Sequence, residues 1–285
     1  MLIRALAVTC LLVAPTALPV AISPAFAASE VIAPISTDEL MRLATLDVVF
    51  ATFAETIADS PDTQGVPLPA KMRSAWRDAA LASFDAAQLQ AELAQALQGQ
   101  FTPSETTAIA DFFKTDIGKV VSAMERETAL LSTADQLSAH ATGTALLADL
   151  PPESRRATQI GEILDLVSAE IGRAMLGSAM RAMLASMSIA GAHGDIEVPW
   201  DEIDAQLAQI LPAMEAEVEA SQRAVLAYAY RSLSDTELDA YVEFLRTDTA
   251  RRFYAYVGFS IATIVHDAMS RFGEELATRL KQVSV

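Results

Sequence analysis

Residues 101–119 read FTPSETTAIADFFKTDIGK, and residues 233–251 read LSDTELDAYVEFLRTDTAR. When the two stretches are aligned without a gap, 5 of 19 positions are identical, and others exchange like for like, as in Asp111/Glu243. The identical pairs are Glu105/Glu237, Ala108/Ala240, Phe112/Phe244, Thr115/Thr247 and Asp116/Asp248. This internal repeat predicts a chain built from two related halves, which constrains the fold more than any single residue does.

Each copy of the motif begins with a helix start. Thr102 and Ser234 each stand three residues before a glutamate, which is the spacing of a capping box. Pro103 occupies the first helical position, where its missing N–H costs no hydrogen bond. Apolar residues then recur at helical period. They are Ala108, Ile109, Phe112 and Phe113 in the first copy, and Ala240, Tyr241, Phe244 and Leu245 in the second.

A second helix start follows in each copy. Thr115 and Thr247 can cap a new helix, and the aspartate after each of them suits the positive end of the helix dipole. The motif therefore predicts helix, tight joint, helix. We expect Phe112 and Phe244 to be equivalent buried positions, with the aromatic residues filling the core.

The motif resembles a bacterial family called domain of unknown function 2059. The shared pattern is [TS]-x-x-E-x-x-A-x-x-[DE]-F, followed by an aromatic residue or Leu, and then [KR]-T-x-x-G-[KR]. The first copy matches it through Gly118 and Lys119, whereas the second has Ala250 there. Family members usually carry proline after the threonine, where this chain has aspartate. The resemblance implies an exported helical protein without established activity, and it carries over no catalytic residue.

The N-terminus has the features of a secretory signal peptide. Arg4 gives a positive start, residues 5–13 are apolar and uncharged, and Ala25-Phe26-Ala27 is a small-x-small cleavage site. We expect cleavage after Ala27 and a periplasmic or secreted protein. An uncleaved N-terminal anchor is the alternative. After cleavage the chain would have no integral membrane span.

The composition narrows the classes of partner. Without residues 1–27 the chain has 19 basic against 37 acidic residues, a formal net charge of −18. Nucleic acid and bare anionic membranes are unsuitable partners for such a surface, because both attract cationic proteins. The only cysteine, Cys10, lies in the leader, so the mature protein needs no disulfide.

The pattern along the chain predicts an all-α helical bundle built from two related multi-helix halves. The halves are residues 28–150 and 151–285, joined at Pro151-Pro152 and packed as one body after the leader at 1–27. Helix formers dominate, and no stretch alternates at the period of a strand. We expect helices over residues 38–58, 70–83, 86–98, 104–114, 116–147, 153–190, 200–231 (with a kink or break near Pro212) and 249–282, with loops at 59–69 and 191–199.

Residues for catalysis are scarce. The three histidines, His140, His193 and His266, lie far apart, with His193 in a predicted loop and His266 expected to be half-buried. We find no nucleophile elbow, phosphate-binding loop or dinucleotide fingerprint. We therefore expect no metal, no cofactor and no enzyme activity. A cryptic hydrolase assembled from scattered residues is the alternative.

Residues 171–190 form an unusual apolar segment. Small residues separate four methionines, and two arginines argue against a membrane span. The methionines are Met175, Met180, Met183 and Met187. The segment is either a central helix packed on several sides or an adaptable apolar binding surface. The leading hypothesis is thus a non-catalytic exported protein that binds another envelope component. The alternative is a carrier or chaperone-like module that holds an apolar ligand in a Met-lined cavity.

Overall fold

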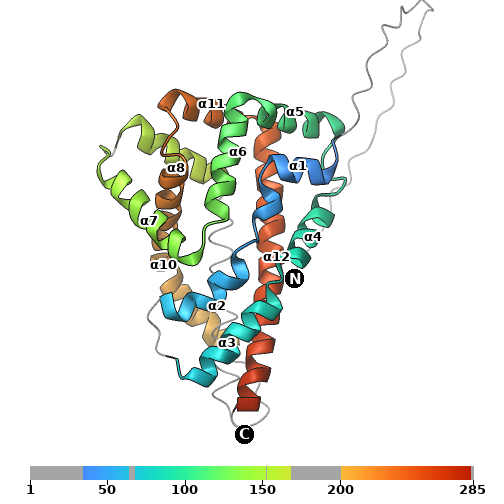
Figure 1. Cartoon of the computed structure of the whole chain (residues 1–285), viewed down its shortest axis with the longest axis vertical. Helices are drawn as coiled ribbons and strands as arrows, with labels where there is room; N and C mark the ends of the chain where they lie inside the picture. The colour runs from blue at the N-terminus through green and yellow to red at the C-terminus, as the bar shows by residue number, and fades with distance from the viewer. Residues whose placement is uncertain (1–34, 64–67, 152, 168–199, 284–285) are drawn as a thin grey trace, which may run out of the picture. The chain divides into compact units, whose positions relative to one another are not determined.

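The computed structural model describes residues 35–63, 68–151, 153–167 and 200–283 of the chain. These residues form helices linked by short joints, without any strand, so the all-α prediction is confirmed for them (Figure 1). The elements are α1 (Thr37–Leu43), η1 (Leu46–Val48), α2 (Phe53–Thr63), α3 (Ala70–Ser83), α4 (Ala86–Leu97), α5 (Pro103–Lys114), α6 (Asp116–Ala129), α7 (Thr133–Ala148), α8 (Arg155–Val167), α10 (Trp200–Ala229), α11 (Asp235–Arg246) and α12 (Asp248–Val283).

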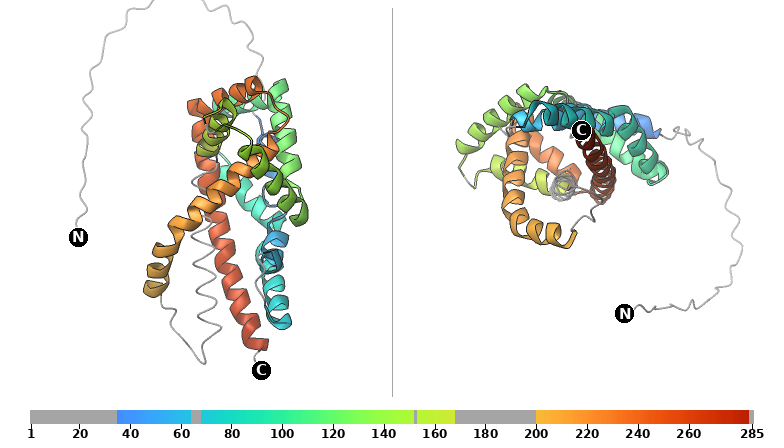
Figure 2. Two further views of the ribbon diagram at one scale, coloured as in Figure 1. Left: turned by 90° about the vertical axis from the view of Figure 1, so that its left-hand side faces the viewer. Right: turned by 90° about the horizontal axis from the view of Figure 1, so that it is seen from below.

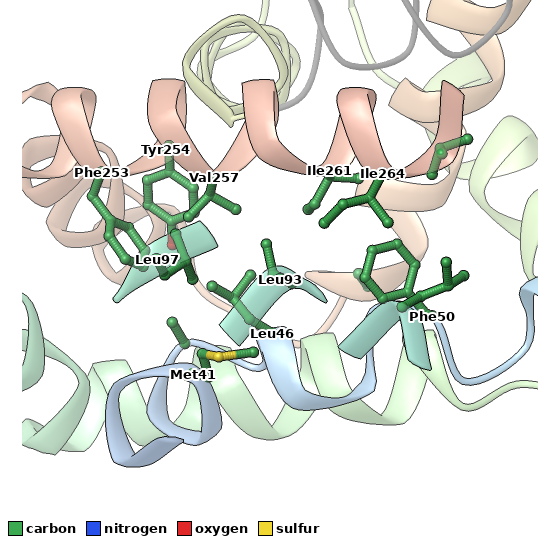
Figure 3. Packing of buried hydrophobic residues seen from close by; sticks show 14 of the residues in the cluster. Met41, Leu46, Phe50, Leu93, Leu97, Phe253, Tyr254, Val257, Ile261 and Ile264 are labelled. Carbon is green, nitrogen blue, oxygen red and sulfur yellow. The ribbon is translucent and has the colours of Figure 1, made fainter. Parts of the chain in front are cut away.

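One core is shared by helices from both sides of the joint at residues 151–153. Helix α12 packs against α3, α4 and α5, while α10 packs along α7. Figure 3 shows one face of α12 pointing at side chains of the N-terminal helices and α4. The facing residues are Phe253, Tyr254, Val257, Ile261 and Ile264 on α12, and Met41, Leu46, Phe50, Leu93 and Leu97 opposite.

Both motif copies fold as helix, joint, helix. The backbone N–H of Glu105 donates to the Thr102 hydroxyl, and that of Glu237 donates to the Ser234 hydroxyl, at 3.3 Å in each case. In each copy the glutamate carboxylate accepts from the backbone N–H of the capping residue, which completes the capping box. In Figure 1, α5 and α11 lie at the same end of the molecule, and α6 and α12 run away from that end.

The predicted apolar stripe is shifted by one position. Ala108 and Ala240 are exposed, and the helix faces that enter the core are those of Ile109, Ala110 and Phe113 in α5 and of Tyr241, Val242 and Leu245 in α11. Phe112 and Phe244 were expected to be buried, but both are half-buried. The reason is that these two rings stack on each other at the edge of the core rather than inside it.

The order of elements is similar around the two motif copies. The copies are offset by 132 residues, since Phe101 aligns with Leu233. With this offset α10 falls over residues 68–97, which α3 and α4 occupy, and α12 falls over residues 116–151, which α6 and α7 occupy. The contacts are also reciprocal: α3 packs on α12, and α10 packs on α7.

Capping residues break two helices of the first half that are continuous in the second. Asp85 caps α4 by accepting from the backbone N–H of Gln88 at 2.7 Å, and the position aligned with it, Glu217, lies inside α10. Ser132 caps α7 in the same way, while the aligned Ile264 is buried inside α12. The single helix expected over 116–147 is therefore wrong. Short Asp and Ser side chains reach the orphan N–H groups of a helix start, which Glu and Ile do not.

The N-terminal region also differs from the expectation of one helix over 38–58. After α1, Thr45 adopts a left-handed conformation (φ 61°), and its hydroxyl donates to the Ser122 carbonyl. Helix α2 then runs through Pro61, inside the predicted loop 59–69. Because Pro61 has no N–H, the Ile57 carbonyl is free to accept from the Trp76 indole at 2.7 Å.

The remaining helices follow the prediction closely where they are described. An exception is the break expected near Pro212, which is wrong, because α10 continues through this residue as one helix. Helix α8 covers the first part of the expected helix 153–190, and the rest of that helix, together with the loop at 191–199, lies outside the described residues. Figure 2 shows α12 and α10 from two further sides.

Candidate functional site

The sequence-predicted binding surface falls outside the described residues. This applies to Met175, Met180, Met183 and Met187, and also to His193. Of the other two histidines, His140 is half-buried on α7, and His266 is exposed on α12 rather than half-buried as expected. Among the described residues, no group of three or more His, Cys, Asp or Glu side chains is placed to hold a metal ion.

The most unusual polar group of the described core is Glu125 on α6. Its Oε1 atom accepts a hydrogen bond from the Tyr230 hydroxyl at 2.6 Å and another from the Tyr241 hydroxyl at 2.9 Å. The Tyr254 hydroxyl lies 3.5 Å from that of Tyr241. We call these four residues the tyrosine–glutamate cluster. It joins α6 to α11, to the joint before α11 and to α12, so that one carboxylate links segments that lie more than 100 residues apart.

The position of Glu125 follows from the helical period of α6. The buried residues Gly118 and Val121 precede it by seven and four positions, so the carboxylate lies on the inward stripe. A glutamate at an inward position is the signal by which sequence reasoning could have found it, because the stripe otherwise carries small or apolar residues. The tyrosines themselves read as ordinary core residues, and the structure alone brings them to Glu125.

The environment of the cluster favours protonated groups. Burial raises the pKa of the Glu125 carboxyl, and the hydrogen bonds from Tyr230 and Tyr241 lower it by less. Burial, followed by the nearby carboxylate, raises the pKa of all three tyrosines, so they stay hydroxyl donors at neutral pH. None of the ion pairs formed by the described residues includes Glu125. Within the described part of the chain, its charge is therefore offset by hydroxyl dipoles.

Further contacts hold the Tyr230 end of the cluster in place. From α8, the Arg156 guanidinium donates to the carbonyls of Tyr230 at 3.2 Å and of Leu233 at 2.5 Å. From α6, Glu127 pairs with Arg231 at 3.5 Å. The segment between α10 and α11 is thus fixed from two sides, which positions the Tyr230 hydroxyl on the carboxylate.

The aligned joint of the first copy is fixed by a different residue. There the Arg252 guanidinium of α12 pairs with the capping-box carboxylate of Glu105 and donates to the Gln100 carbonyl at 3.1 Å. Arg252 also lies over the Phe101 ring. The first joint is therefore held by an arginine of α12 and the second by an arginine of α8. Among the described residues, the tyrosine–glutamate cluster lies at the second joint.

The cluster can bind and release a proton. The Glu125 carboxyl accepts from the Tyr230 and Tyr241 hydroxyls, which can donate to it in either protonation state. Its chemistry is that of a proton-binding contact between helices.

Part of the chain matches a known protein family. Residues 87–149 match a family model described as an uncharacterized protein conserved in bacteria (DUF2059). This segment is therefore similar to the DUF2059 family. The resemblance drawn from the first motif copy is thereby confirmed. The DUF2059 segment runs from the first turn of α4 to just past the end of α7 and includes Glu125, while the three tyrosines lie beyond it.

No curated protein and no solved structure matches the chain. Within the described residues, no helix combines the length and the apolarity that crossing a bilayer requires.

Proposed function

We propose that this chain is an exported, non-catalytic helical protein that binds another component of the bacterial cell envelope. The pattern of residues 1–27 supports export to the periplasm or the exterior. The bacterial DUF2059 segment fits this setting without assigning an activity. The formal charge of −17 for the whole chain favours a neutral or cationic partner surface over nucleic acid.

The two most exposed large apolar side chains of the described residues support a binding role. Phe259 on α12 is 72% exposed, and Leu137 on α7 is 57% exposed. An aromatic ring this exposed contributes little to the core, whereas aromatic residues often anchor interfaces. Phe259 is the observation that carries the binding proposal furthest.

Site-specific photo-crosslinking tests the proposal. A photoreactive phenylalanine analogue replaces Phe259 in the full chain, in the native bacterium, and the same analogue at the exposed Thr263 of α12 is the matched control. We expect one discrete crosslinked envelope component from position 259 and a weaker or different pattern from position 263. Identical patterns from both positions would contradict a specific partner at Phe259.

The carrier hypothesis is the second proposal, and the four methionines of residues 171–190 support it. A fluorescent apolar probe such as N-phenyl-1-naphthylamine should then bind saturably to the purified protein. Replacing Met180 and Met183 by glutamate should weaken the binding at least tenfold. Probe binding that is weak, non-saturable or unchanged in this variant would argue against a Met-lined site.

We also infer that residues 28–150 and 151–285 arose as two copies of one helical unit. The matching capping boxes, the 132-residue offset of the long helices and the reciprocal packing of α3 on α12 and α10 on α7 support this inference. In this arrangement each half covers the long helices of the other, so the partner-binding unit is the whole body.

A further inference from the structure

Two central members of the tyrosine–glutamate cluster, Glu125 and Tyr241, have apolar counterparts at the aligned crossing of α5 with α12, whereas Tyr230 and Tyr254 align with the polar residues Gln98 and Ser122. With the 132-residue offset, Val257 aligns with Glu125 and Ile109 aligns with Tyr241. Both aligned residues are apolar and buried, at 2% and 0% exposed. At these two positions the crossing of α5 with α12 is packed with apolar contacts, whereas the aligned crossing of α6 with α11 is packed around a carboxylate.

This difference indicates that the fold does not need the carboxylate. Burying a charge costs free energy that apolar packing of similar volume avoids. Val257 and Ile109 show that apolar residues suffice at the aligned positions. The presence of a carboxylate at the crossing of α6 with α11 therefore needs an explanation other than packing.

The groups that face Glu125 determine how it responds to protons. Tyr230 faces it from the joint before α11 and Tyr241 from α11, while Tyr254 of α12 reaches it through Tyr241. Its charged neighbours on α6 have other partners, since Arg126 pairs with Asp47 and Glu127 with Arg231. Among the described residues, therefore, only hydroxyl groups interact with the carboxylate of Glu125.

We propose that protonation of Glu125 tightens the crossing of α6 with α11, and that its ionisation loosens it, which makes this contact between the two halves sensitive to pH. A protonated carboxyl keeps its carbonyl oxygen as an acceptor for both tyrosines at no charge-burial cost. An ionised carboxylate keeps the same hydrogen bonds but holds an unpaired negative charge beside the core.

The sign of the effect follows from linkage. Burial places the pKa of Glu125 in the folded protein above its ordinary value of 4.5. The folded state therefore binds this proton more tightly than the unfolded state does. The contribution of Glu125 to stability is complete below 4.5 and is lost as the pH rises through the folded pKa.

Urea unfolding of the full chain at a series of pH values between about 4 and 8 tests the proposal. Glu125→Gln is a neutral, nearly isosteric replacement, and Asp111→Asn at an exposed position of α5 is the control. We expect the unfolding midpoint of the wild type to fall relative to Glu125→Gln as the pH rises, and the Asp111→Asn protein to follow the wild type. A wild-type midpoint that stays parallel to Glu125→Gln, or rises relative to it, would overturn the proposal.

Two measurements on the wild type keep the test independent of how the variant folds. A carbon-13 titration of the Glu125 side-chain carboxyl should give a midpoint above 4.5, and a midpoint at or below 4.5 contradicts the proposal. Hydrogen exchange, corrected for intrinsic rates, should show α11 amides opening more readily above that midpoint. Equal protection of α11 on both sides of the midpoint would show that the proton is bound without loosening the crossing, which also contradicts it.

Discussion

The rings of Phe112 and Phe244 lie face to face, with centroids 3.8 Å apart and planes at 1°. These residues occupy the same position in the two motif copies, so a residue contacts its own equivalent. Such a contact is typical of a local two-fold relationship, in which residue i meets j and j meets i. The reciprocal packing of α5 on α12 and α6 on α11 has the same character.

The stack predicts a coupled loss of stability. Phe112→Ala or Phe244→Ala should each cost about 2 kcal/mol, below the 3–5 kcal/mol typical of a fully buried phenylalanine, because both rings are half-buried. The double variant should cost about 0.5–1.5 kcal/mol less than the sum of the single ones. Urea unfolding measures all three, with the buried Phe113→Ala as the full-cost control. Strict additivity would mean that the stack contributes nothing of its own.

Local signals in the sequence predicted much of the motif, and long-range contacts explain what they missed. Thr102 and Ser234 bond to backbone groups three residues away, so their capping boxes can be predicted from the three-residue spacing to a glutamate alone. Ser132, three residues before Asp135, is a local cap of the same kind, and the prediction missed it because apolar residues and helix formers surround it. The Glu125 cluster needs partners 105 and 116 residues distant, which no local pattern records.

A second prediction concerns the crossing of α7 and α10 at Gly143. A Cβ atom there would lie 1.8 Å from the Ala224 carbonyl oxygen, so Gly143→Ala must push the helices apart. We expect a loss of about 1–3 kcal/mol, although alanine is the better helix former by about 1 kcal/mol. Thermal or urea unfolding measures it.

Gly161→Ala is the matched control for this crossing. A Cβ atom at Gly161 meets only the end of the Arg223 side chain, at 3.2 Å, which can move aside. Its stability should therefore be unchanged or slightly higher, following helix propensity. A Gly143→Ala protein as stable as Gly161→Ala would show that α7 and α10 do not approach as closely as described.

A third prediction is a pH dependence opposite in sign to that of Glu125. The hydrogen bonds from the Ser234 side chain and backbone lower the pKa of the Glu237 carboxyl below its ordinary 4.5. A depressed folded pKa means that its stabilisation is present above 4.5 and is lost as the pH falls through the folded value. Glu237→Gln should therefore be less stable than the wild type at neutral pH and equal to it in acid. If the gap between the two proteins widens in acid, the capping box is not the cause.

Export provides a fourth prediction. N-terminal sequencing of the protein from a periplasmic or culture fraction should begin at Ala28, because the small residues at positions 25 and 27 fit the signal peptidase site. Replacing Ala27 by a bulky residue should cause the precursor to accumulate, since the site requires a small side chain. A protein that keeps Met1 and stays in the cytosol would refute the proposed compartment.

The last prediction concerns the joint between the two halves. Residues 151 and 153 are exposed, so a protease recognition sequence inserted there should be cut in the native full-length protein. Because α12 packs on α3 and α10 packs on α7, each fragment covers apolar faces of the other. The cut fragments should therefore elute together in gel filtration and unfold in one transition.

The Phe112→Ala/Phe244→Ala background should make the cut complex dissociate more readily, whereas an uncut sample of the same variant stays whole. Fragments that separate into two stable, cooperatively folded monomers would show that each half has a core of its own, and the reciprocal arrangement of the halves would then be wrong.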